Sequence, residues 1–381
     1  MEHTFTANIK SILDNKFGKD ANDIFEKSLI LKYINVKTRS ANKGSKSRSS
    51  FANLYAIYVL VEDYISKSFH QKSGYKDYEG AMHSTLLERA KTLKFGDKLQ
   101  NHALDNRLND EFRKKISKSE LVPIIHNSET KRLHINENLL QISVGNRTFN
   151  LAESIIEIID EYSRAKQSAL QLFLKTCKEM QKIESSKSEQ VIQFISSLLA
   201  KEVDARLFEI VSYSILKFYY HDQHIFWGYE IDNLTKDNLK LFKTGRTNAN
   251  DGGIDFVMQP LGRFFQVTET LDFKKYFLDI DKIQKFPITF VIKSNDTTEV
   301  ILSNIKAKAN KIYLVTAIVE KYMTCIEEVI NIPILKERFS HSIKLGYLNN
   351  ILNEIVTQSK VEFNYSETEE SDEVEEIFEA D

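Results

Sequence analysis

The sequence predicts an α/β protein with a mixed central sheet flanked by helices, preceded by an N-terminal, mostly helical α+β domain. Two observations predict this fold class. From about residue 203 onward, short apolar and β-branched runs alternate with segments of helical periodicity, as strands and helices do in one layered domain. Before that point, apolar residues recur at helical spacing in 19–35 and 51–69, and strand-like runs fill 121–151.

Composition describes an ordinary globular protein with room for two or three domains. The chain has 381 residues, of which 42% are hydrophobic and 28% are charged. No apolar run approaches the roughly 18 residues that a membrane span needs, and the first residues lack the charge pattern of a signal peptide. The two cysteines, Cys177 and Cys325, are unclustered, which excludes a disulfide framework. We therefore expect a cytoplasmic protein without a membrane partner.

The charge is distributed unevenly along the chain. Residues 367–381 carry nine acidic and no basic side chains, so removing them from the net charge of −2 leaves a body of +7. A basic body with an acidic tail fits a nucleic-acid partner. The alternative is a solvated acidic terminus that only aids solubility, and for the tail taken alone we prefer that alternative.

The first half of the chain is expected to be helical, then briefly β, then helical again. Residues 78–118 have a helical pattern. Gly145-Asn146 separates two alternating runs, which predicts a hairpin turn. Helical periodicity then runs from residue 152 to 199, with a break expected at 185–188.

The second half predicts the sheet, and the chain divides into four parts: 1–151, a helical connector at 152–200, 201–345, and a C-terminal helix with the acidic tail at 346–381. Helices are expected at 203–220, 273–284, 296–309 and 317–330. Strands are expected at 224–230, 254–258, 263–269, 287–293 and 311–316.

The segment KTGRTNANDGGIDFVMQPLGRFFQVTET, residues 243–270, carries the chemistry. It predicts a glycine-rich turn, a strand that begins at Asp255, a short hairpin, and a strand bearing Gln266 and Thr268. The parity of the two strands lets these three side chains lie together. Polar groups between Ile, Phe and Val are costly unless something satisfies them, and carboxylate oxygens suit Mg²⁺. The alternative for Asp255 is a turn residue that accepts backbone hydrogen bonds.

This segment resembles the core of PD-(D/E)xK nucleases, in particular the Mrr-like branch of restriction endonucleases. The upstream helix RLFEIVSYSILKFYY fits too, because that family carries a glutamate on its first core helix. The resemblance covers residues 203–295. It implies a restriction-endonuclease-like core, in which Glu209 and Asp255 hold Mg²⁺ and Gln266 takes the position of the family's second acidic residue.

One departure from the family pattern affects catalysis. The family's lysine position is Thr268 here, and threonine supplies no positive charge. We expect another cation to act, with Lys274 and Lys275 at the start of the next helix ranked first. The other candidates are Lys243, Arg246 and Lys293.

A basic run lies between the first predicted helices. It holds Lys37, Arg39, Lys43, Lys46 and Arg48 without an acidic residue, and Lys243 and Arg246 lie in the glycine-rich turn. These side chains are candidates for contacts with DNA phosphates. An exposed, solvated loop explains the run about equally well.

The resemblance implies a Mg²⁺-dependent endonuclease, and we expect a type II restriction enzyme that cuts double-stranded DNA at a specific site. Residues 201–345 would be its nuclease domain and residues 1–151 its DNA-recognition or accessory domain. Cutting both strands needs two active sites, so a homodimer is expected. The alternative is a catalytically weakened nuclease fold that binds DNA or serves as a subunit of a defence complex. Binding or cleavage of RNA is a third, less favoured, possibility.

Overall fold

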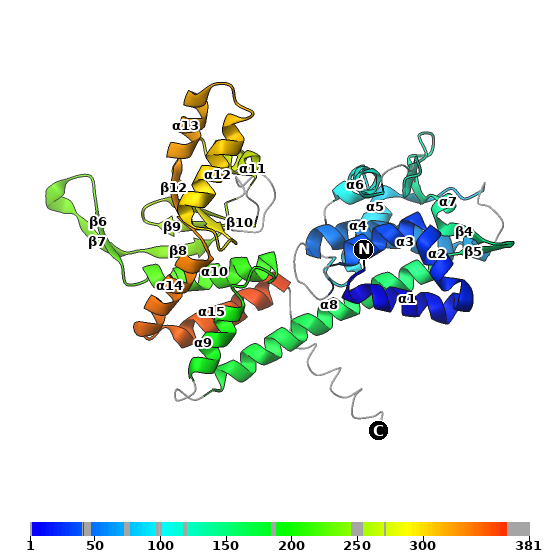
Figure 1. Ribbon diagram of the computed structural model, residues 1–381, viewed down its shortest axis with the longest axis horizontal. Coiled ribbons are helices and arrows are strands. Elements are labelled where there is room, and N and C mark those ends of the chain that lie inside the picture. Colours follow the sequence, from blue (N-terminus) through cyan, green and yellow to red (C-terminus); the bar gives the residue numbers. More distant parts are fainter. Residues whose placement is uncertain are drawn as a thin grey trace. The chain divides into compact units, whose positions relative to one another are not determined.

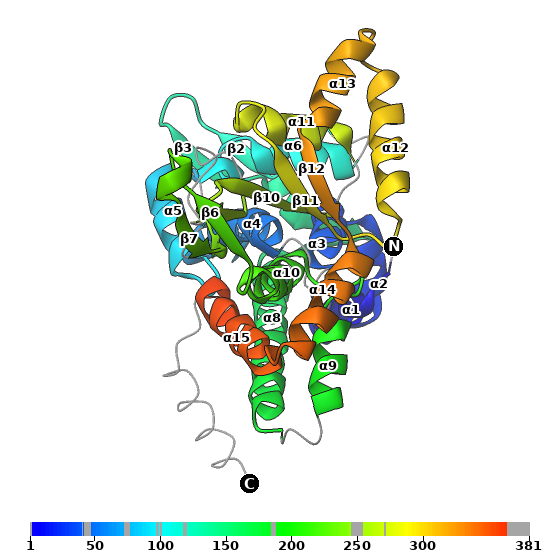
Figure 2. The ribbon, with the colours of Figure 1, turned by 90° about the vertical axis from the view of Figure 1, so that its left-hand side faces the viewer.

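A computed structural model gives the fold of the chain. The structure describes residues 2–39, 41, 47–71, 77–96, 99, 101–116, 120–183, 188–244, 254–269 and 272–363, without the side chains of 47–49 and 363. The chain forms two compact units, Met1–Phe173 and Leu174–Asp381, whose elements are labelled in Figure 1 and shown from a second side in Figure 2. Each unit is described by itself.

Unit 1 is mostly helical and is built around one long buried helix. Its helices are α1 (Thr4–Phe17), α2 (Ala21–Lys27), α3 (Leu29–Thr38), α4 (Ser47–Ser66), α5 (His83–Thr92), α6 (Arg107–Lys115), α7 (Glu137–Leu140) and the first part of α8 (Ala152–Gln181). Helix α4 packs against α3, α5, α6 and strand β3. Its Leu54, Ile57 and Val61 are fully buried, and their spacing gives the helix the apolar face that the sequence predicts.

The strands of unit 1 form two small sheets. β1 (Ala81–Met82), β3 (Arg132–Ile135) and β2 (Ile124–His126) pair in that order, and β4 (Gln141–Val144) pairs with β5 (Arg147–Asn150) as an antiparallel hairpin. Gly145 turns this hairpin with a φ of +58°, a conformation that glycine adopts without strain. The predicted hairpin is confirmed.

Unit 2 alternates helices and strands. Its helices after α8 are α9 (Ser188–Ser197), α10 (Ala205–Tyr220), α11 (Phe273–Lys282), α12 (Thr298–Asn310), α13 (Thr316–Thr324), α14 (Ile332–Lys344) and α15 (Leu348–Phe363). Its strands are β6 (His224–Trp227), β7 (Thr235–Asn238), β8 (Lys240–Lys243), β9 (Phe256–Gln259), β10 (Arg263–Thr268), β11 (Ile288–Ile292) and β12 (Ile326–Ile330).

The centre of unit 2 is a mixed five-stranded sheet in the order β12-β11-β10-β9-β8. The pairs β8–β9 and β9–β10 are antiparallel, and β10–β11 and β11–β12 are parallel. On one face, Phe290 and Ile292 pack into a core with α11 and α12. On the other, Tyr213 of α10 stacks its ring 5.3 Å from that of Phe256. The predicted mixed sheet with helices on both faces is confirmed (Figure 1).

One predicted strand is wrong. Residues 311–315 connect α12 to α13 and form no strand, and the strand lies at β12, inside the helix that we expected over 317–330. The sequence of β12, IEEVI, looks helical because two glutamates interrupt it. In the fold Arg263 pairs with Glu327 at 2.9 Å and with Glu328 at 2.7 Å, and this pairing lets an acidic segment form the sheet edge.

Other predictions hold in part. Among the described residues of 78–118, α5, α6 and a short 3-10 helix at Asn101–Ala103 are helical, and strands β7 and β8 have no counterpart among the predicted elements. The expected connector corresponds to α8 and α9, although the boundary between the two units falls inside α8. Helix α15 packs against α10, so residues 348–363 belong to unit 2. Within the described part of the chain, no helix has the length and apolar character to cross a membrane.

Candidate active site

Glu209 lies on the first turns of α10, held by the cap of that helix. The Asp204 carboxylate accepts the backbone N–H groups of Arg206 and Leu207 at 2.5 and 3.0 Å, which fixes where the helix begins. Glu209 follows on the next turn with 7% of its surface exposed. A glutamate buried to this degree requires charged partners.

Two cations bind the Glu209 carboxylate. Arg206 Nη1 lies 2.5 Å from one carboxylate oxygen, and Lys243 Nζ lies 2.9 Å from the other. Arg206 also pairs with Glu362 of α15, at 3.3 Å. The Lys243 side chain is 14% exposed, so its ammonium faces Glu209 and not solvent. A contact between Lys243 and DNA phosphates stays a prediction, and it would require this ion pair to open.

Asp255 is fixed by backbone hydrogen bonds on both sides. Its N–H donates to the Phe265 carbonyl at 3.0 Å, and its carbonyl accepts the Thr244 N–H, also at 3.0 Å. Its carboxylate oxygen Oδ2 accepts the N–H of Val267 at 2.7 Å. The β9–β10 hairpin pairs Val257 with Phe264 and Phe256 with Phe265, which confirms the antiparallel arrangement predicted for these strands. The residue is thus held rigidly beside β10.

Burial, followed by the nearby charge of Glu209, raises the pKa of the Asp255 carboxyl to about 7. The Val267 N–H and the charges of Arg206 and Lys275 oppose this shift. Asp255 therefore lies close enough to Glu209, Arg206 and Lys275 for their charges to change its pKa. A carboxyl with a pKa raised by burial and by a second acid is typical of functional sites.

Gln266 and Thr268 face the same side of β10 and are both buried, with 7% and 4% of their surfaces exposed. The Gln266 amide nitrogen donates to the Val267 carbonyl at 3.2 Å. Its Oε1 is buried and has no hydrogen-bond partner in the described residues. Such an acceptor costs about 1–3 kcal/mol, which a cation or a ligand donor would recover.

Among the candidate cations, Lys275 reaches the site. Its Nζ donates to the Thr268 hydroxyl at 3.2 Å, so the ammonium stands beside the position where the family pattern has its lysine. Its neighbour Lys274 is exposed. Lys293 is committed elsewhere, since its Nζ lies 2.7 Å from Glu269 and also donates to the Val203 carbonyl. The structure thus distinguishes Lys275, which contacts Thr268, from Lys274, which is exposed. The sequence alone does not make this distinction.

The basic run in unit 1 is described only at its start. Lys37 lies at the end of α3, is 7% exposed and pairs with Glu111 at 3.0 Å. A phosphate contact of Lys37 stays a prediction, and it would require this buried ion pair to open. Arg39 is exposed. Lys43, Lys46 and Arg246, and the side chain of Arg48, lie outside the described residues.

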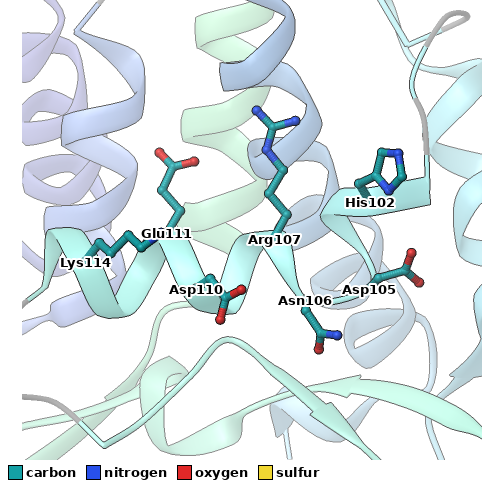
Figure 3. A pocket seen from close by; sticks show the side chains of 7 residues that line it. All are labelled: His102, Asp105, Asn106, Arg107, Asp110, Glu111 and Lys114. Atoms are coloured by element: carbon teal, nitrogen blue, oxygen red, sulfur yellow. The ribbon is translucent and has the colours of Figure 1, made fainter. Parts of the chain in front are cut away.

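A pocket of about 490 Å³ lies in unit 1, on α6 and the segment before it. Figure 3 shows Arg107 and Glu111 pointing to one side of α6 and Asp110 to the other. The charged residues that line the pocket are His102, Asp105, Arg107, Asp110, Glu111 and Lys114. Acids and bases balance there, and Glu111 is already bonded to Lys37 and Asn53. We therefore prefer the Asp255 cluster (Glu209, Asp255, Gln266, Thr268 and Lys275) as the functional site.

Sequence reasoning missed Arg206 and Glu362. Arg206 stands three residues before Glu209 on one helix, a spacing that brings side chains together, so it could have been found. Glu362 carries no local signal, because its contact to Arg206 spans most of unit 2.

In the described part of the chain, no group of three or more His, Cys, Asp or Glu side chains is arranged to hold a metal ion. Comparison with protein families, with curated proteins and with solved structures finds no match.

Proposed function

We propose that the chain is a Mg²⁺-dependent endodeoxyribonuclease whose active site is the Asp255 cluster. The observation that carries the proposal is the pairing of a buried carboxyl of raised pKa, Asp255, with a buried amide oxygen of Gln266 that has no partner. Both are hard oxygen donors. Their burial close together would be stabilised by a cation, which both oxygens can bind.

The residues present fit a magnesium ion. Asp255 and the Gln266 amide oxygen would hold it, and Glu209 would join them by exchanging one of its two ion pairs. Mg²⁺ commonly takes one or two carboxylates and completes its shell with water and phosphate oxygens. When bound, it neutralises the charge that develops on a phosphodiester and activates water.

Lys275 provides the positive charge that the family pattern puts on the strand. Its ammonium, held at the Thr268 hydroxyl, would stabilise negative charge on the phosphate. This supports activity despite threonine at position 268. The order of α10, the β8–β9–β10 strands, α11 and β11 also agrees with the helix, hairpin and strand order that the resemblance implies.

Further parts of the proposal concern the substrate. The net charge of +7 without the acidic tail favours DNA as the polyanion. A type II restriction enzyme, acting as a homodimer on double-stranded sites, is the form of nuclease that we propose. Arg39, exposed at the end of α3, remains a candidate phosphate contact.

One observation favours a second candidate, a nuclease fold that binds DNA without cutting it. Both oxygens of Glu209 are held by Arg206 and Lys243, which leaves fewer free ligands for the metal. This form of the protein would retard DNA equally with and without Mg²⁺.

Digestion of a plasmid and a viral DNA of known sequence tests the proposal. The parent protein is incubated with Mg²⁺, with EDTA, and as the Asp255→Asn variant. Discrete fragments with Mg²⁺ alone, and none from the variant, support the restriction enzyme. A smear supports a non-specific nuclease, and intact but retarded DNA supports the second candidate. Equal cutting by Asp255→Asn would rule out the site.

A further inference from the structure

The ribbon β6–β7, here called the arm, exposes a row of large apolar side chains. Its four cross-strand pairs form a two-stranded sheet with no third strand among the described residues. Tyr229 and Ile231 are 104% and 88% exposed. The exposed apolar residues of the arm are Phe226, Trp227, Tyr229, Ile231 and Leu234. An isolated two-stranded ribbon is marginally stable in water, and an apolar patch of this kind marks an interaction surface.

A second apolar patch lies where α12 connects to α13, and we call it the tip. Leu314 is 100% exposed there, the highest value for any aliphatic side chain of the described residues. Ile312, Val315 and Ile318 surround it and are also exposed. Ile312, Leu314 and Val315 lie in the segment 311–316 that the sequence predicted to be a strand, and in the fold their side chains are exposed.

The arm and the tip cannot cover each other within one molecule. Strand β7 leads directly into β8 at one edge of the five-stranded sheet, and α13 leads into β12 at the opposite edge. Figure 1 shows the two segments extending from different sides of the sheet. Within the described residues of unit 2, neither patch therefore covers the other.

The two patches have opposite charge. The arm carries the exposed acidic side chains Glu230 and Asp232 and one exposed lysine, Lys236, so it is acidic on balance. The tip carries the exposed lysines Lys308, Lys311 and Lys321 and one exposed acid, Glu320, which pairs with Lys306 at 2.7 Å, so it is basic on balance. The acidic arm disfavours DNA as its partner and matches the basic tip, and complementary charge of this kind selects and orients partners.

We propose that the arm of one copy of this chain packs on the tip of a second copy. In a two-fold symmetric dimer each copy then contributes one arm and one tip, as an isologous interface requires. The exposed fractions of the five arm residues correspond to roughly 700 Å² at about 200 Å² for a large side chain. Burying two arms removes about 1,400 Å², which is in the range of stable interfaces.

The oligomeric state in solution tests the dimer, and it is independent of any nuclease activity. Sedimentation is measured over about 1 to 100 µM, since interfaces of this size give micromolar or tighter dissociation constants. We expect the parent to dimerise, and Tyr229→Glu/Ile231→Glu in the arm and Leu314→Glu in the tip to be monomers. Leu345→Glu, at an apolar residue 49% exposed outside both patches, is the matched control and stays dimeric. Circular dichroism verifies the fold of each variant.

Two further variants test that the arm meets the tip and not another arm. Asp232→Lys and Lys311→Glu each place like charges together and should weaken association about ten-fold, and the double variant should recover it. Mixing the arm variant with the tip variant should restore partial association, because one intact contact remains. A monomeric parent across the range, or a tip variant that dimerises as the parent does, would overturn the proposal.

Discussion

Two buried polar clusters, one in each unit, differ in how they offset the free-energy cost of burying charged groups. In unit 1, Lys37 pairs with Glu111 at 3.0 Å and Asn53 donates to the same carboxylate at 2.6 Å, so one cation meets one anion. In unit 2, Asp255 lies in the field of a second acid, Glu209, and the Gln266 amide oxygen has no partner among the described residues. The first cluster pairs its charges, and the amide oxygen of Asn53 is also buried without a hydrogen-bond partner among the described residues. The second cluster brings two carboxyl groups within range of each other, and this repulsion, not the unpartnered amide oxygen, distinguishes the candidate site from a structural ion pair.

The largest effect is expected on catalysis. Asp255→Asn keeps the size of the side chain and an acceptor for the Val267 N–H, but removes the charge that would hold Mg²⁺. Cleavage should fall by about 1,000-fold or more, because the charge stabilisation from a catalytic metal is worth several kcal/mol. The measurement is the initial rate of plasmid cleavage. Glu111→Gln in unit 1 is the control and should cut at the parent rate below its melting temperature.

Asp255→Asn and Glu111→Gln should affect stability in the opposite order to their effect on cleavage, so Glu111→Gln should be the more destabilising variant. Glu111→Gln leaves the buried Lys37 ammonium without its counter-charge and should lower the free energy of unfolding by about 3 kcal/mol. Asp255→Asn removes a buried carboxylate that is repelled by Glu209 and should not destabilise. Denaturant titration measures both. Replacing the whole pair, as in Lys37→Met/Glu111→Leu, should recover most of the loss. If Asp255→Asn proved the more destabilising variant, the distinction between the clusters would be lost.

The two adjacent lysines of α11 should differ in activity. Lys275→Met removes the ammonium that contacts Thr268 and should slow cleavage by about 10- to 100-fold, as loss of one stabilising charge does. Lys274→Met, at an exposed position, should change the rate and the stability little. The rates are compared at saturating Mg²⁺. Equal losses for both variants would mean that the lysines act only through general attraction to DNA.

The last expected effect is a dependence of stability on pH. The pKa of Asp255 is raised from 3.8 in the unfolded chain to about 7 in the fold, so the folded state binds a proton that the unfolded state releases. The resulting contribution to stability is present below pH 3.8 and is lost as pH rises to about 7. Unfolding free energies of the parent and of Asp255→Asn, measured between about pH 4 and 8, should diverge through this window and run parallel above it. A constant difference would contradict the raised pKa.

The local pattern of the sequence was sufficient to predict much of the fold and about half of the candidate site. Periodicity predicted α4, α8, α10 and the β9–β10 hairpin, because in each the buried face repeats at the period of the element. It failed at β12, where the distant Arg263 pairs with two glutamates of the edge strand. It also failed at residues 311–315, where apolar side chains are exposed.

For the site, spacing brought Asp255, Gln266 and Thr268 together, because they lie on one hairpin. It could not choose between Lys274 and Lys275, since both begin the same helix and only packing decides which one faces β10. It also placed Lys37 and Lys243 on the surface. Each is buried instead beside a glutamate, Glu111 or Glu209, whose approach depends on the tertiary fold.

Calorimetric titration of the parent with Mg²⁺, in buffers of different ionisation enthalpy, tests the central claim most directly. At about pH 6.5 the Asp255 carboxyl is largely protonated, so binding of the cation should release a proton, and this release should vanish at about pH 8.5. Asp255→Asn should show neither the binding nor the release. Magnesium binding that is identical in parent and variant, or a parent that binds no magnesium, would contradict the assignment of a cation site to Asp255.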